Sequence, residues 1–335
     1  MIRVFDSWLI HTVVVIGLTL SVSGCYYVQA ARGQLEVMNK REPIDEVIGA
    51  GDTPAELSRR LQVVKEARQF SIDELQLPDN DSYRTYADIE RDYVVWNVFA
   101  APEFSLEPMS WCFPVAGCVN YRGYFAEDKA RRKASRLEDD GLDVAVGGVA
   151  AYSTLGKFSD PVLNTMMHWE DVDLVAVIFH ELAHQMLYVK GDSEFNESFA
   201  TAVEEFGIKG WLSNRNQSTE LTSYRERREL RERLMQHIAE ARTDLEAIYS
   251  ASISSDEMRL QKNDRFERLN RDLAAELESS GRESPTWLND GLNNARLASM
   301  SLYHGRLAEF RALLAECSED LNCFYMLARE LAKDL

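Results

Sequence analysis

The spacing of apolar residues predicts strands and helices in the first half of the chain and helices alone in the second half. A capping box at 53–56, followed by apolar residues at helical spacing, predicts a helix over about 54–69. Runs rich in β-branched and aromatic residues predict strands over 93–100 and 142–153, with a shorter strand over 121–125. The fold class that follows is α+β.

Beyond Gly210 the pattern is helical. In the first two of these segments Arg and Glu stand at spacings that allow ion pairs along one helix. The predicted helices are 225–250, 255–278, 293–315 and 321–333. We expect a hairpin and a bundle packed on the first half. This divides the chain into a region over 53–215 and a helical region over 216–335.

One helix of the first half carries candidate chemistry. Residues 174–179 are almost all apolar, so the helix begins buried, and it continues into the motif HELAH. His180 and His184 lie four residues apart on one helix face and can direct two imidazoles at one ion. Glu181 lies beside them, close enough to hold a metal-bound water and take its proton. A catalytic zinc site usually has three protein ligands, and Glu197 can return as the third after a short turn.

The two motifs together resemble the gluzincin pattern, in which H-E-x-x-H is followed by N-E-x-x-A and its glutamate is the third zinc ligand. Here HELAH is followed by NESFA over 196–200, with fewer intervening residues than in thermolysin-like enzymes. The chain also resembles a bacterial family of predicted zinc aminopeptidases in WCFPVAGCVNYRGYF, AYSTLG, FHELAHQ and FNESFA. The resemblance implies a zincin-like core, one zinc held by His180, His184 and Glu197, and a peptide substrate. It also implies Glu181 as the general base.

Further residues are candidates for supporting roles. Glu204 lies two helical turns beyond Glu197 and can support a ligand histidine, although a solvated glutamate is an equal alternative. Gluzincins also stabilise the oxyanion with a Tyr or His, and the resemblance suggests Tyr303 or His304. Exopeptidases usually bind the free amine of the substrate with carboxylates. The available ones are Asp192, Glu194 and Glu205.

Two other functions remain open. A zinc endopeptidase needs no pocket for a free amine. A non-catalytic envelope lipoprotein could carry the metal as a structural ion, but such a site is closed by a fourth ligand. None of the four histidines outside the motif sits close to it in the sequence, which favours an open, catalytic site.

The N-terminus predicts export and a lipid anchor. Residues 1–25 combine a short positive start, an apolar run over 9–20 and the lipobox-like VSGC. Cleavage before Cys25 would leave this cysteine for lipidation, and we expect 26–52 to be a tether. An outer-membrane protein facing the periplasm follows, with contact to the membrane through the N-terminal lipid. A plain signal peptide or a membrane anchor with an incidental cysteine is the alternative.

The remaining cysteines agree with export, and the net charge bears on the possible partners. Four cysteines form two pairs with five residues between the members: Cys112 with Cys118, and Cys317 with Cys323. An even number in an oxidising compartment favours disulfides, and of three connectivities we favour these local pairs over a second metal site. The formal charge of −18 argues against nucleic acid as a partner, because phosphate binding needs a basic surface.

Overall fold

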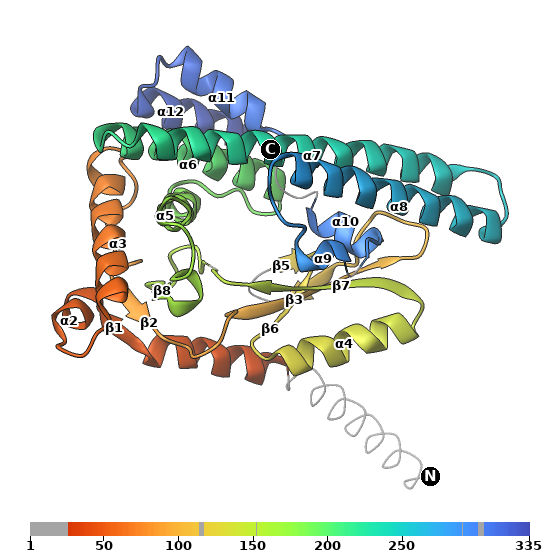
Figure 1. The fold of residues 1–335 in the computed structure, drawn as a ribbon, viewed down its shortest axis with the longest axis horizontal. Coiled ribbons are helices and arrows are strands. Elements are labelled where there is room, and N and C mark those ends of the chain that lie inside the picture. Colours follow the sequence, from red (N-terminus) through yellow and green to blue (C-terminus); the bar gives the residue numbers. More distant parts are fainter. Residues whose placement is uncertain (1–25, 114–116, 152, 290, 301–304) are drawn as a thin grey trace, which may run out of the picture.

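A three-stranded antiparallel sheet lies near the middle of the protein, with helices on both sides of it (Figure 1). The computed structural model describes residues 26–113, 117–151, 153–289, 291–300 and 305–335. Strand β3 (Val95–Pro102) is central and pairs with β6 (Arg122–Tyr124) and β7 (Leu142–Val149). The three predicted strands are therefore present in one sheet, and the α+β prediction is confirmed.

Two smaller sheets complete the strands of the described residues. One has the order β1-β2-β8, and the other is a hairpin of β4 and β5. Their bounds are β1 (Arg41–Pro43), β2 (Thr85–Ala87), β8 (Val162–Leu163), β4 (Trp111–Phe113) and β5 (Gly117–Val119).

Helices of the first half surround these sheets. A helix over 26–39 and α4 lie along one side of the molecule in Figure 1. After the helix over 26–39, the helices of the first half are α2 (Ile44–Gly49), α3 (Ala55–Asp73), α4 (Glu127–Asp139), α5 (Asp171–Met186) and α6 (Ser193–Asn214). Among the described residues, no helix has the length and apolar character needed to cross a membrane.

The segment 26–52, predicted as a tether, is instead part of the fold. It forms the helix over 26–39, strand β1 and helix α2. Val37, Ile44 and Val47 are buried in the main hydrophobic core. The polar composition of the segment misled the prediction, because a few apolar side chains on one face are enough to dock a short helix.

The second half consists of a long hairpin followed by short helices. Helices α7 (Ser218–Ser250) and α8 (Ser255–Ser279) run side by side along one edge of the molecule (Figure 1). The predicted helix over 293–315 is interrupted, because Gly305 and Arg306 form a turn. The helices that follow the hairpin are α9 (Thr286–Asn289), α10 (Asn294–Met300), α11 (Leu307–Glu316) and α12 (Leu321–Leu331).

The main hydrophobic core joins the last helices to the first half of the chain. On α6, the Phe199 ring stacks on Phe324 of α12 at a centroid distance of 5.8 Å, and Phe310 of α11 packs edge-on against it at 5.7 Å. The Tyr325 hydroxyl donates a 2.7 Å hydrogen bond to the Leu75 carbonyl. Helices α11 and α12 thus complete the packing that fixes α5 and α6.

Candidate metal centre

The turn between α5 and α6 is built so that α6 returns beside α5. Asp192 caps α6 by accepting a 2.8 Å hydrogen bond from the Phe195 amide. The Asn196 side chain accepts a 2.7 Å bond from the Val189 amide and donates a 2.8 Å bond to its carbonyl. The asparagine before Glu197 therefore clamps the loop, and the next residue of α6 faces α5.

Three side chains from α5 and α6 meet at this point. His180 Nε2 lies 3.2 Å from His184 Nε2 and 3.2 Å from Glu197 Oε2, and His184 Nε2 lies 3.6 Å from Glu197 Oε1. In a tetrahedral site with zinc bonds of about 2.0–2.1 Å, neighbouring ligand atoms lie about 3.3–3.4 Å apart. The spacing of these three residues fits a zinc-sized cation, and among the described residues they are the group of His, Cys, Asp or Glu side chains that could hold a metal ion.

The pKa values of His180 and His184 indicate that the cluster favours one added positive charge. Burial lowers the pKa of His180, but hydrogen bonds to the Glu197 and Glu204 carboxylates outweigh it and raise the pKa to about 10. Burial, together with the charge of His180, lowers the pKa of His184 to about 4. The cluster therefore attracts one added positive charge, which a proton on His180 or a metal cation can supply.

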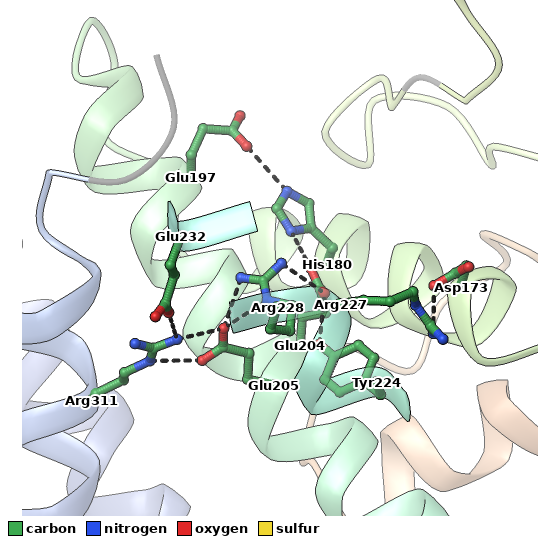
Figure 2. A network of polar contacts seen from close by, with 10 residues as sticks. All are labelled: Asp173, His180, Glu197, Glu204, Glu205, Tyr224, Arg227, Arg228, Glu232 and Arg311. Atoms are coloured by element: carbon green, nitrogen blue, oxygen red, sulfur yellow. Dashed lines mark hydrogen bonds and ion pairs between the residues drawn. The ribbon is translucent and has the colours of Figure 1, made fainter. Parts of the chain in front are cut away.

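Glu204 supports the first histidine from behind. Its Oε2 lies 3.1 Å from His180 Nδ1, which leaves Nε2 of that ring free to face the other two ligands (Figure 2). The Tyr224 hydroxyl donates a 3.0 Å hydrogen bond to Oε1 of the same carboxylate. Although burial raises the pKa of Glu204, the hydrogen bond and charge of His180, with Arg228 and Tyr224, lower it overall. The buried carboxylate thus stays charged.

In the part of the chain that the structure describes, His184 has no carboxylate behind its ring of the kind that Glu204 provides for His180. His184 Nδ1 is buried without a hydrogen-bond partner among the described residues, and the ring packs edge-on to Tyr188 at 6.3 Å.

Glu181 is not a member of the three-residue group. Burial, followed by the charges of Glu197 and Asp160, raises the pKa of Glu181 to about 7 against the opposing effect of His180. A carboxyl with that pKa can both take and give a proton near neutral pH.

Several predicted residues lie away from the centre or outside the described residues. Asp192 caps α6, Glu205 pairs with Arg228 and Arg311, and Glu194 packs against Gly305. The structure therefore does not gather these three carboxylates at the metal group. Outside the described residues lie Cys25, Tyr303 and His304.

Two tyrosines that the sequence did not mark lie beside the cluster. Tyr188 follows α5, and Tyr121 lies between β5 and β6; both side chains are exposed. Tyr121 is 38% exposed, and burial of the rest of the residue raises its pKa; the charges of Tyr188, Glu197 and Glu181 add to the rise. The side chain of Tyr121 thus interacts electrostatically with Glu197 and Glu181. No short motif could have found it, because it lies far from HELAH in the sequence.

Both local cysteine pairs are joined. One disulfide links Cys112 and Cys118, which face each other across β4 and β5. The other links Cys317 and Cys323 between α11 and α12. Gly117 of the β4–β5 hairpin has a φ of +76°, and a Cβ there would lie 3.8 Å from Lys190 Cε. The disulfide-linked β4–β5 hairpin therefore lies next to the loop that connects α5 and α6.

Comparison with known families covers nearly the whole chain. The family described as "Putative aminopeptidase" matches residues 25–334. The chain belongs to this family. No curated protein and no solved structure matches it. The aminopeptidase family match includes α7 to α12 as well as α5 and α6, so the helical second half is part of what defines the family.

Proposed function

We propose that this protein is a zinc-dependent aminopeptidase of the bacterial cell envelope. The observation that carries the proposal is the group of His180, His184 and Glu197, whose ligand atoms are spaced at 3.2–3.6 Å. Two imidazoles and one carboxylate are a donor set typical of catalytic zinc. The aminopeptidase family supports a peptide as the substrate.

Each residue has a chemical task in this proposal. A bound zinc would act as a Lewis acid toward the peptide carbonyl. Glu181 accepts a proton as water adds to the carbonyl carbon, and it passes that proton to the amine when the C–N bond breaks. Tyr121, whose pKa is raised by burial and by the charges of Tyr188, Glu197 and Glu181, is our candidate to donate a hydrogen bond to the carbonyl oxygen as negative charge develops there. Glu204 holds the His180 ring.

An endopeptidase is the second candidate, and one observation favours it. Of the carboxylates that could have bound a free amine, Asp192 caps α6, Glu205 pairs with Arg228, and Glu194 lies against Gly305; none of the three is a member of the metal group. A structural zinc is less well supported, because the metal-binding group of the described residues offers three ligands rather than four.

The proposed address is the periplasmic face of the outer membrane, through a lipid on Cys25. The sequence VSGC supports it. The residue directly after this cysteine is packed on the protein: the Tyr26 ring stacks on Phe113 at 5.3 Å, and the Arg122 guanidinium lies 4.1 Å from the centre of the Tyr26 ring. A lipid at Cys25 would therefore hold the protein close to the bilayer.

The test compares the parent protein with Glu181→Gln. The variant should keep its zinc and its melting temperature, while cleavage of peptides should fall by about 10²–10⁴-fold because Gln cannot accept the proton. Glu229→Gln is the matched control, since Glu229 is an exposed glutamate of α7. Unchanged cleavage in Glu181→Gln would remove this residue from the mechanism.

Pairs of peptides with free and acetylated N-termini separate the two peptidase candidates. An aminopeptidase should cleave only the free form, and an endopeptidase both forms. A parent protein that binds zinc but cleaves no member of a peptide library would contradict both and leave the structural-zinc alternative.

A further inference from the structure

The polar contacts that begin at His180 continue across three helices. Glu204 and the next residue of α6, Glu205, face Arg228 of α7, and Glu205 also contacts Arg311 of α11 (Figure 2). The chain of contacts thus leads from the candidate metal centre to the C-terminal helices.

Arg228 stands between two consecutive carboxylates. Its Nε and Nη2 donate hydrogen bonds of 3.0 and 2.7 Å to Glu205 Oε1, and its Nη1 lies 3.7 Å from Glu204 Oε1. The side chains of Arg228, Glu204 and Glu205 are only 15, 13 and 17% exposed. Neighbouring carboxylates with so little solvent repel one another, and a guanidinium between them offsets that repulsion.

We propose that Arg228 is a positioning residue of the metal centre: from 3.7 Å, its guanidinium holds the Glu204 carboxylate in the orientation that fixes the His180 ring. Orientation of a ligand histidine by its partner typically changes metal affinity by about 10–100-fold. The inference rests on the proposed function only in taking the metal to be zinc.

Arg228 is itself fixed from α11. Arg311 Nε donates a 2.9 Å hydrogen bond to Glu205 Oε2, and its Nη2 donates bonds of 2.9 Å to Glu205 Oε1 and 2.7 Å to Glu232 Oε1. Two parallel bonds from one guanidinium to one carboxylate define the geometry strongly. The position of Glu205, and with it that of Arg228, therefore depends on α11.

The experiment measures the zinc dissociation constant by competition with a chelator, without any substrate. Arg228→Met should raise this constant by about 10-fold or more. The matched control is Arg233→Met, which removes an α7 arginine paired at 2.9 Å with Glu276 of α8. That control should leave zinc affinity within about 2-fold of the parent, because exposed ion pairs contribute little.

A double-mutant cycle separates positioning from general loss of structure. In a Glu204→Gln background the Arg228→Met change should alter zinc affinity by less than about 2-fold, since the carboxylate it acts through is gone. An equal loss of affinity in both backgrounds, or no loss in the single variant, overturns the proposal.

Two further outcomes are assigned in advance. If Arg228→Met does not fold, Arg228→Lys replaces it: this variant keeps the charge but loses the fork, and its zinc constant should still exceed the parent's several-fold. A parental constant in Arg228→Lys overturns the proposal. A parent that binds zinc but lacks peptidase activity contradicts the proposed function and leaves the role of Arg228 standing, whereas a parent without zinc affinity overturns both.

Discussion

At Gly207, α6 lies close to Leu75 and to Phe179 of α5, and alanine there should destabilise the protein. A Cβ on Gly207 would lie 2.7 Å from Leu75 Cδ1 and 2.7 Å from Phe179 Cδ2, two buried side chains. Carbon atoms prefer separations of about 3.5–4.0 Å, so the neighbours would have to move by roughly 1 Å. Overpacking of this kind costs about 1–3 kcal/mol, against a gain of about 1 kcal/mol from helix propensity.

Gly210 on the same helix provides the matched control. A Cβ there would lie 3.3 Å from the tip of the Phe70 ring, and the helix propensity gain is the same. The difference in unfolding free energy between Gly207→Ala and Gly210→Ala should therefore be about 1–3 kcal/mol, with Gly207→Ala the less stable. Guanidinium chloride denaturation with the metal chelated measures it.

The same pair of variants reports on the site. Phe179 precedes His180, so its displacement should weaken zinc binding in Gly207→Ala but not in Gly210→Ala. Equal stabilities of the two variants would refute the reasoning, because the close approach of α6 would then carry no cost.

The remaining predictions concern the metal and the cysteines. Free zinc at 1,000 times its dissociation constant should add about 4 kcal/mol to the unfolding free energy, and His184→Ala should abolish this dependence; denaturation with and without chelator checks both. A His184→Ala protein that zinc still stabilises would contradict the site. Cys25→Ser should abolish labelling with a fatty-acid analogue, and the denatured, unreduced mature protein should show no free thiol by titration.

The helix that carries His180 and His184, and the return of Glu197 to it, could be predicted because their contacts are local. The four-residue spacing of His180 and His184 fixes their common face in any helix, whatever surrounds it. Glu197 follows after a turn too short to lead elsewhere, and Asn196 clamps that turn. The structure accordingly places all three together.

Glu204 could be named from its helical spacing, but the residues that contact it could not be predicted, because they come from distant parts of the chain. Tyr224 and Arg228 belong to a helix whose arginines and glutamates all read as a solvated surface. Only the packing of α7 on α6 selects which of them become buried partners of Glu204. Tyr121 is a comparable case, since it interacts electrostatically with Glu197 and Glu181 from a distant part of the sequence.

The tether prediction failed for a related reason. Composition reports how much apolar surface a segment has, and 26–52 has little. Composition does not report whether another part of the chain offers a complementary surface. Here Val37 and Ile44 pack into the main hydrophobic core. Docking of a short segment is a property of two surfaces, of which the local sequence contains one.

The contribution of α11 and α12 to the main core has a consequence for synthesis and export. Phe199 of α6 cannot make its ring contacts until Phe310 and Phe324 have been translated. The Leu75 carbonyl likewise has no hydrogen bond from Tyr325 until that residue has been translated. Domains generally fold as units once their chain is available, so this core cannot close early on the ribosome. A chain whose core cannot fold until the last helices have been synthesised stays unfolded for longer. An unfolded chain can be translocated across a membrane, as the proposed envelope location requires.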